Sequence, residues 1–187
     1  MLIFSVLGFL YFTKMEVNGM NWIRVILDGI AMSAVFNFGV AVFWSCRPSS
    51  FTGMFAKELK EIVPPMNKDD KKHLTVMYLT VYLPVLLYGV ISAWNGGIAG
   101  FWNLFLASYI QAFLINLGDF FGLDILFREK MGTRLQIPGT EGHDLYTRKM
   151  WLKTLAIKEH WVWWPLGFCP AIALISAGLG VLLRIML

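Results

Sequence analysis

The sequence carries little charge for its length. Charged residues make up 15% of its 187 positions, whereas hydrophobic residues make up 57%. A soluble domain of this size has about 25% charged residues, and fewer than half of its residues are apolar. The apolar residues also stand in long runs, which is typical of a chain that crosses a bilayer. The composition therefore predicts an all-α polytopic membrane protein, formed as one bundle without a second, soluble domain.

Cysteines and the common catalytic signatures are also scarce. Cys46 and Cys169 stand far apart and lack Cys-x-x-Cys spacing, which argues against a disulfide framework and a thiolate metal site. The sequence contains no Walker loop, nucleophile elbow or dinucleotide fingerprint. Its net charge of +4 comes from two loops between apolar runs. Because no basic face with interleaved aromatic residues accompanies that charge, we do not expect nucleic-acid binding.

Five apolar runs predict a bundle of about five transmembrane helices. Tryptophans bracket the second run at the spacing of two interfacial anchors, and Pro84 predicts a kink in the third. The fourth run is about 45 Å long as a helix. It exceeds the hydrocarbon core, so its acidic end must emerge or be sheltered by protein. The predicted crossings are residues 1–17, 22–45, 74–94, 98–127 and 161–185.

Two polar loops, residues 46–73 and 128–160, hold most of the lysines and arginines. By the positive-inside rule both loops face the cytoplasm of a cell-membrane protein. With five crossings the N-terminus is then also cytoplasmic and the C-terminus external. Near the start of the second crossing, Arg24 and Asp28 are one helical turn apart and predict an ion pair at the external interface.

The end of the fourth run contains the most unusual residues. On a helix, Asn116, Asp119 and Asp124 are placed so that all three can face one cavity. Gly118 and Gly122 form a small-xxx-small pair that permits close approach of another helix. Ionisable residues near membrane depth are costly and usually functional. The structural alternative is that the two aspartates cap the helix or pair with basic residues of the next loop.

Further acidic and histidine residues follow in the second polar loop and at the start of the fifth run. We predict that Asp119, Asp124, Glu141 and His160 are catalytic residues that meet in a cavity open to the cytoplasm. The same four with His143 are candidate ligands of a divalent metal, because carboxylates and imidazoles suit such ions. Their spacing matches no metal motif, and a histidine at an interface more often hydrogen-bonds a headgroup or a neighbouring helix.

Four motifs follow one another in the C-terminal half of the chain: Asn116-Leu-Gly-Asp119, Leu123-Asp124, Ile137-Pro-Gly-Thr-Glu141, and Tyr146 with His160. In residues and order they resemble a family of small bacterial integral membrane proteins. That family has Asn-Leu-Phe-Asp and Leu-Asp on one helix, a Pro-Gly-Thr-Glu loop, and a downstream tyrosine and histidine. Gly118 stands where the family has phenylalanine, and the sequence between Glu141 and His160 differs from that of the family. The resemblance implies where a site lies and brings no reaction with it.

Three functions from different classes are compatible with these residues. The chain is a membrane-embedded enzyme with a cytoplasm-facing acidic site, a small proton- or cation-coupled transporter, or a non-catalytic subunit of a membrane complex. A transport path needs polar groups near the midplane, where only Asn37 lies. A purely structural role needs fewer polar groups than the chain has. We therefore favour the enzyme, with the bilayer as its setting, a lipid or other hydrophobic substrate, and membrane proteins as candidate partners.

Overall fold

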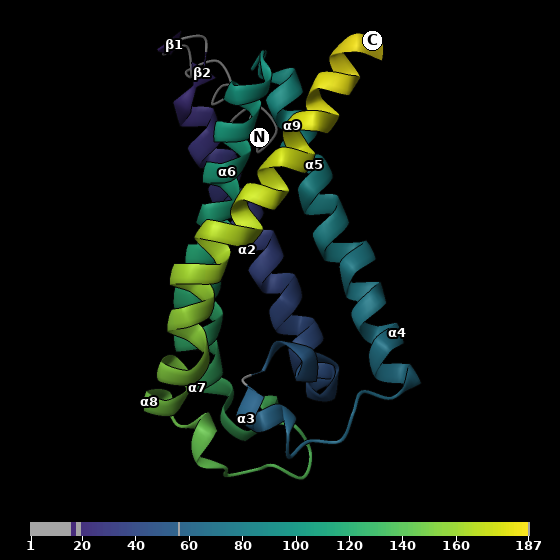
Figure 1. Cartoon of the computed structure of the whole chain (residues 1–187), viewed down its shortest axis with the longest axis vertical. Coiled ribbons are helices and arrows are strands. Elements are labelled where there is room, and N and C mark those ends of the chain that lie inside the picture. Colours follow the sequence, from purple (N-terminus) through teal and green to yellow (C-terminus); the bar gives the residue numbers. More distant parts are fainter. Residues whose placement is uncertain (1–15, 18–19, 56, 187) are drawn as a thin grey trace, which may run out of the picture.

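Four long helices dominate the computed structural model, which describes residues 16–17, 20–55 and 57–186 (Figure 1). Each is long and apolar enough to cross a membrane, and the all-α prediction is confirmed. Their bounds are Trp22–Cys46, Lys68–Asn95, Phe101–Leu135 and Arg148–Met186. The predicted crossings 22–45, 74–94 and 161–185 lie inside three of these helices. The predicted crossing 98–127 lies in the third long helix, which begins at Phe101 instead of residue 98.

The predicted first crossing, residues 1–17, lies outside the described residues except for its last two. Glu16–Val17 form strand β1, which pairs antiparallel with β2 (Met20–Asn21), with Glu16 opposite Asn21. These two residues therefore form a strand, and the rest of that predicted crossing stays a prediction. Strand pairing satisfies the backbone at these positions, and a helix begins only at Trp22, after the Asn21 side chain has capped it by accepting from the Arg24 amide at 3.0 Å.

Helix α2 (Trp22–Cys46) packs very closely on α6 (Phe101–Gly118). A Cβ atom added at Gly29 would lie 2.5 Å from Leu114 Cδ1, and one added at Gly118 would lie 2.1 Å from Ser33 Oγ. Small residues on both helices thus permit this approach, as in membrane helix pairs generally. Of the predicted small-xxx-small pair, only Gly118 permits close approach of another helix. A Cβ atom at Gly122 would meet nothing within 4 Å.

The second long helix consists of α4 (Lys68–Met77), a π-helical turn η2 (Tyr78–Tyr82) and α5 (Leu83–Asn95). Asn67 and Asp70 form a reciprocal capping box, so the helix begins in what was predicted as polar loop. The π-turn lies directly before Pro84, which has no amide hydrogen to donate to the preceding turn. Figure 1 shows α4 and α5 diverging from α6 and α9 toward the lower end of the molecule.

The last two long helices also contain π-helical segments. The third consists of α6, the π segment η3 (Asp119–Phe127), α7 (Arg128–Met131) and a 3-10 turn η4 (Gly132–Leu135). The fourth contains α8 (Arg148–Trp151), the π segments η6 (Leu152–Ala156) and η7 (Glu159–Phe168), and α9 (Cys169–Met186). Much of the predicted loop 128–160 is therefore helical, and the connection, which includes the short turn η5 (Asp144–Tyr146), is correspondingly short.

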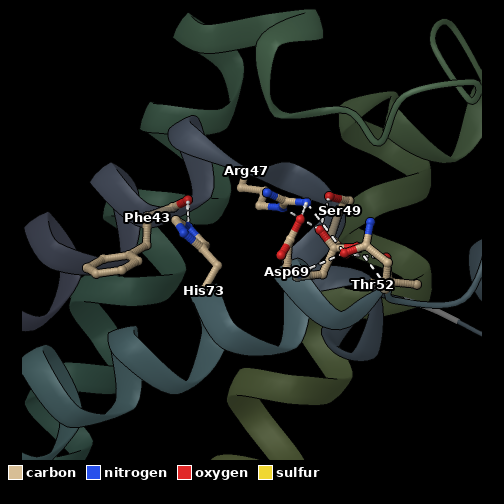
Figure 2. A network of polar contacts seen from close by, with 8 residues as sticks. Phe43, Arg47, Ser49, Thr52, Asp69 and His73 are labelled. Carbon is tan, nitrogen blue, oxygen red and sulfur yellow. Dashed lines mark hydrogen bonds and ion pairs between the residues drawn. The ribbon is translucent and has the colours of Figure 1, made fainter.

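A polar network fastens the lower end of α2 to the start of α4 (Figure 2). Arg47 Nε and Ser49 Oγ both donate to Asp70 Oδ1, at 2.5 and 2.7 Å. His73 Nε2 lies 3.0 Å from the carbonyl oxygen of Phe43. Between the two helices, η1 (Pro48–Met54) and α3 (Lys57–Lys60) fold back under the bundle. These contacts make the first polar loop a structured floor for the interior.

The two basic connections lie at one end of the molecule, and the strands and the C-terminal end of α9 lie at the other (Figure 1). At the upper end the predicted pair is confirmed, with Arg24 Nε 3.7 Å from Asp28 Oδ2. Asp28 also accepts from Tyr88 OH at 2.8 Å and from Ser92 Oγ. Large apolar side chains such as Phe38 and Leu166 point outward, 73% and 77% exposed. An outward apolar surface is the arrangement that lipid contact requires.

Candidate functional site

A buried histidine joins the two helices that contain the predicted site. His160, on η7, is 2% exposed and uses both ring nitrogens: Nδ1 lies 2.6 Å from Asn116 Oδ1, and Nε2 lies 2.9 Å from Asp124 Oδ2. Asn116 belongs to α6 and Asp124 to η3. Buried polar groups need partners, and here each satisfies the others. The three side chains therefore form one linked unit between distant parts of the chain.

The hydrogen bonds determine where the protons lie on His160. Asn116 Nδ2 donates to the backbone carbonyl of His160 at 2.9 Å, so its Oδ1 must be the acceptor that faces Nδ1. Nδ1 therefore carries a hydrogen. One further proton lies between Nε2 and Asp124 Oδ2, because an unprotonated nitrogen facing a carboxylate would make no hydrogen bond. The pair is either imidazolium with carboxylate or imidazole with carboxylic acid.

A second layer of contacts holds Asp124 in place. Its Oδ1 accepts from the indole Nε1 of Trp151 at 3.0 Å. Arg128 Nε donates to the backbone carbonyl of Asp124 at 3.0 Å, and its Nη1 donates to the carbonyl of Tyr146 at 2.6 Å. The Arg128 guanidinium carbon also lies 5.1 Å from the centre of a Trp151 ring, within cation–π range. Arg128 thus supports the helix and ring around Asp124 and forms no ion pair with its carboxylate.

The unit borders a cavity of about 340 Å³. Residues of three π-helical segments line it: Tyr78 and Tyr82 from η2, Asp119, Leu123 and Asp124 from η3, and Glu159, His160, Trp164 and Phe168 from η7. A π-helical turn shifts which residues share a face and often occurs at functional sites. Here such turns aim polar side chains from separate helices into one space.

Three polar groups on the cavity wall are free to meet a ligand. Within the described residues the carboxyl group of Asp119 makes no hydrogen bond or ion pair. The indole Nε1 of Trp164 is buried without a hydrogen-bond partner there. The carboxyl group of Glu159 lies close to that indole without meeting hydrogen-bond geometry. The wall therefore offers two carboxyl groups and one donor beside the Asp124–His160 pair.

The structure brings together three of the four residues that the sequence predicts to converge. Asp119, Asp124 and His160 line the cavity, whereas Glu141 does not. Glu141 is exposed in the loop before η5, where its Oε2 accepts from the Gly139 amide at 2.9 Å. His143 is also exposed, and its Nδ1 accepts from the Leu145 amide at 3.2 Å. Both side chains hold the loop in shape instead of reaching the cavity.

The predicted metal set is not assembled. Within residues 16–17, 20–55 and 57–186, no group of three or more His, Cys, Asp or Glu side chains is placed to hold a metal ion. Both ring nitrogens of His160 and both carboxylate oxygens of Asp124 already have protein partners. The imidazole of His160 therefore has no free nitrogen for a metal ion.

The sequence reasoning left two residues of the site without a role. Glu159 precedes His160 directly and lines the same cavity, but it is not among the predicted site residues. Trp151 lies inside the predicted polar loop 128–160, yet its indole donates to Asp124. The signal for Glu159 was present, since a carboxylate beside a buried histidine is rare in an apolar run. Trp151 gave no such signal, because its partner is 27 residues away.

The loop motif of the resembled family has a structural role in this chain. Tyr146 OH accepts from the Ile137 amide at 3.1 Å and lies 2.8 Å from Thr140 Oγ1. Thr140 Oγ1 also donates to the Ile137 carbonyl at 2.8 Å. These bonds close the Pro-Gly-Thr loop on the tyrosine, and Arg128 ties the Tyr146 carbonyl to the site helix. The motif residues thus shape the floor beneath Asp124.

Comparisons with known proteins found no relative of this chain. No protein-family model matches the chain, and neither the curated proteins nor the solved structures contain a match. The resemblance to a family of small bacterial membrane proteins therefore stays a prediction, and the function has to be argued from the site itself.

Proposed function

We propose that the chain is a membrane-embedded enzyme in which Asp124 and His160 act together as a general base on a lipid or other hydrophobic substrate. One observation carries this proposal: an acid–imidazole pair with a fixed tautomer borders a cavity inside a helix bundle. By the positive-inside rule, the cavity opens toward the cytoplasmic side of a cell membrane.

The arrangement of partners favours proton uptake over proton release. Both nitrogens of His160 are bonded to protein, so Asp124 is the member of the pair with lone pairs left for a substrate hydroxyl. When Asp124 takes the substrate proton, the pair gains a positive charge. Asp119 and Glu159, when ionised, offset that charge across the same cavity. Release of a proton would instead leave an anion beside two acidic groups, which is unfavourable.

The substitution Asp124→Asn tests this role with little disturbance of the fold. An asparagine can still accept from Trp151 and can donate its amide to His160 Nε2, so the buried groups stay satisfied. It cannot take up a proton. We expect the variant to unfold at about the wild-type temperature and to lose at least about a hundredfold of the activity, in line with the usual contribution of a general base.

The activity is found by comparing lipid compositions. Purified wild-type chain and variants are reconstituted with the total lipid and small-molecule extract of the expression host, and the products are followed by mass spectrometry. Wild-type chain should deplete one lipid species and form another, and Asp124→Asn should do neither. Glu141→Gln is the matched control, an exposed carboxylate outside the cavity, and should behave as wild type. Identical lipid patterns for wild type and Asp124→Asn would overturn the proposal.

A further inference from the structure

A second cavity, the upper chamber, adjoins the acidic one. It has a volume of about 380 Å³ and lies between α2, α5, α6 and α9. Four side chains, those of Tyr78, Tyr82, Trp164 and Ile172, line both cavities, so the two spaces meet at a shared wall. Ligand pockets in proteins typically have volumes of about 300–1,000 Å³ and mostly apolar walls with a few placed polar groups.

Three polar side chains stand in the otherwise apolar upper chamber. Ser108 and Gln111 come from α6 and Ser176 from α9, and they are 5%, 2% and 5% exposed. Within the part of the chain that the structure describes, none of the three side chains makes a hydrogen bond. The serines do not bond back to their own helix, as Ser45 and Thr80 do. Their polar atoms are not among the fully enclosed atoms that lack a partner, so they reach the open space of the chamber, where an occupant can pair them.

Packing does not explain these three residues. Gly89 of α5 faces Gln111, and a Cβ atom there would lie 3.2 Å from Gln111 Oε1 and 2.9 Å from Met32 Cε. The absent side chain keeps space open in front of the Gln111 amide. Water alone is a poor occupant, because each buried water needs two to four polar partners and takes about 30 Å³. Three polar groups cannot satisfy a chamber of this size filled with water.

We propose that the upper chamber binds an uncharged, membrane-soluble molecule with an apolar body and a hydroxyl or carbonyl group, which Ser108, Gln111 and Ser176 hydrogen-bond. The apolar walls exclude a charged ligand, and the three side chains supply both donors and acceptors. That this molecule is the substrate of Asp124 and His160 rests on the proposed function, and the shared wall places the chamber beside the cavity of that pair. Binding in the chamber does not depend on the reaction.

One face of the last long helix connects the two cavities. His160, Trp164, Phe168, Ile172 and Ser176 follow one another at intervals of four residues, and each lines at least one of the two cavities. Sixteen residues of helix span about 24 Å. A ligand that extends from Ser176 toward His160 is therefore elongated, which suits a lipid chain or a long apolar molecule and not a compact metabolite.

Photolabelling in phosphatidylcholine vesicles tests the proposal. The probe is a long-chain alkyl alcohol with a diazirine beside the carbon that bears the hydroxyl. The comparison probe has the same chain and diazirine with hydrogen in place of the hydroxyl. We expect the alcohol to label α5, α6 and α9 residues of the upper chamber, and the unlabelled alcohol to compete saturably. The hydrocarbon should label the outer apolar surface without saturation.

Variants separate this binding from bilayer contact and from catalysis. Gln111→Leu removes hydrogen bonds at nearly constant volume and should weaken competition by the alcohol about threefold to tenfold. Gly89→Leu fills the chamber and should abolish its labelling, whereas Gly178→Leu, where a side chain meets nothing within 4 Å, should leave it unchanged. Asp124→Asn should keep the labelling although it loses lipid turnover, so failure of the enzyme proposal and failure of the binding proposal give different results.

Two outcomes would overturn the binding proposal. Equal, unsaturable labelling of the chamber by the alcohol and the hydrocarbon would mean that bilayer chains simply fill it. Competition that is the same in wild type and in folded Gln111→Leu would mean that the polar groups do not recognise the ligand. If Gly89→Leu does not fold, Gln111→Leu and the pair of probes still decide the question.

Discussion

Asn116 determines which ring nitrogen of His160 carries a hydrogen. Its amide nitrogen donates to the His160 carbonyl, so its amide oxygen accepts from Nδ1. Without it, the Nδ1 hydrogen and the His160 carbonyl would lie buried and unpaired. Each such group costs about 1–3 kcal/mol of folding free energy. The side chain is thus a positioning residue for the Asp124–His160 pair and a contributor to stability.

We predict that Asn116→Leu lowers the stability of the folded chain by several kcal/mol. The replacement has a similar size and no polar atoms, so both hydrogen bonds are lost. Thermal unfolding in detergent measures the change. Asn103→Leu on the same helix is the control, because Asn103 donates only to the Ala99 carbonyl at an exposed position and should shift the unfolding temperature far less. Similar shifts for both variants would contradict the role of Asn116.

A second prediction at this scale concerns the shared proton. In nitrogen-15 NMR of histidine-labelled chain, His160 should show a hydrogen on Nδ1 in both wild type and Asp124→Asn. In Asp124→Asn, Nε2 should be an unprotonated acceptor, because the asparagine amide donates to it. A one-bond coupling between hydrogen and Nε2 in that variant would contradict the arrangement.

The contact of α2 with α6 illustrates what a single glycine decides at the scale of an element. Asn37 Nδ2 donates to the Ser33 carbonyl at 2.8 Å and to the Ile115 carbonyl of α6 at 3.3 Å. The site helix therefore depends on a close approach that leaves no room for a side chain at Gly118. The phenylalanine that the resembled family has at this position would not fit here.

We predict that Gly118→Ala destabilises the bundle by about 1–3 kcal/mol, the usual cost of overpacking. The added carbon would lie 2.1 Å from Ser33 Oγ and 2.5 Å from Asn37 Nδ2, so the hydrogen bonds between the helices must break or the helices separate. Unfolding in detergent measures the loss, and Ser33→Gly in the same chain should restore part of it.

The matched control is Gly122→Ala, four residues along the same helix. Its added carbon meets nothing within 4 Å, and alanine loses less conformational entropy than glycine on folding. We expect an unchanged or slightly higher stability. Equal destabilisation by Gly118→Ala and Gly122→Ala would mean that the loss at Gly118 does not come from its contact with α2.

At the scale of the whole molecule, the two basic connections share one end (Figure 1). The acidic cavity is lined by residues of η1, which belongs to the first of these connections, whereas the upper chamber is not. In a bilayer crossed by the four long helices, as we propose, this arrangement would bring the polar site nearer to the aqueous side and the chamber deeper. The direction of insertion then decides which compartment supplies water-soluble reactants.

We predict that the basic end faces the cytoplasm, because lysine and arginine in short loops resist translocation. The test is labelling by a membrane-impermeant maleimide in intact cells, with single cysteines in a chain that carries Cys46→Ser. Lys71→Cys and Lys149→Cys, both at exposed positions, should be protected, whereas Ala99→Cys at the opposite end should react. Labelling of positions 71 and 149 from different sides would contradict the fold as well as the orientation.

Features that depend on neighbours along the chain were predictable from the sequence. The long apolar runs predict the helices, and the Arg24–Asp28 spacing predicts their ion pair. The placement of Asp119, Asp124 and His160 in one cavity also followed, because the fourth run is too long for the bilayer and its acidic end adjoins the start of the next crossing. These inferences need only helix periodicity and the thickness of the membrane.

Tertiary structure alone decided the rest. Glu141 and His143 had the right chemistry but stay in the loop, because nearby backbone amides hold them there. Glu159 is the first residue of the π-helical segment η7, where the angle between successive residues differs from that of a fixed α-helical period. Trp151 ends α8, and its contact with Asp124 exists only because two distant helices pack together. In the sequence, Gln111 is a single polar residue in an apolar helix. Its place in a chamber becomes visible only in the structure, where α5 and α9 enclose it. Periodicity is local, whereas a cavity exists only once distant helices have packed.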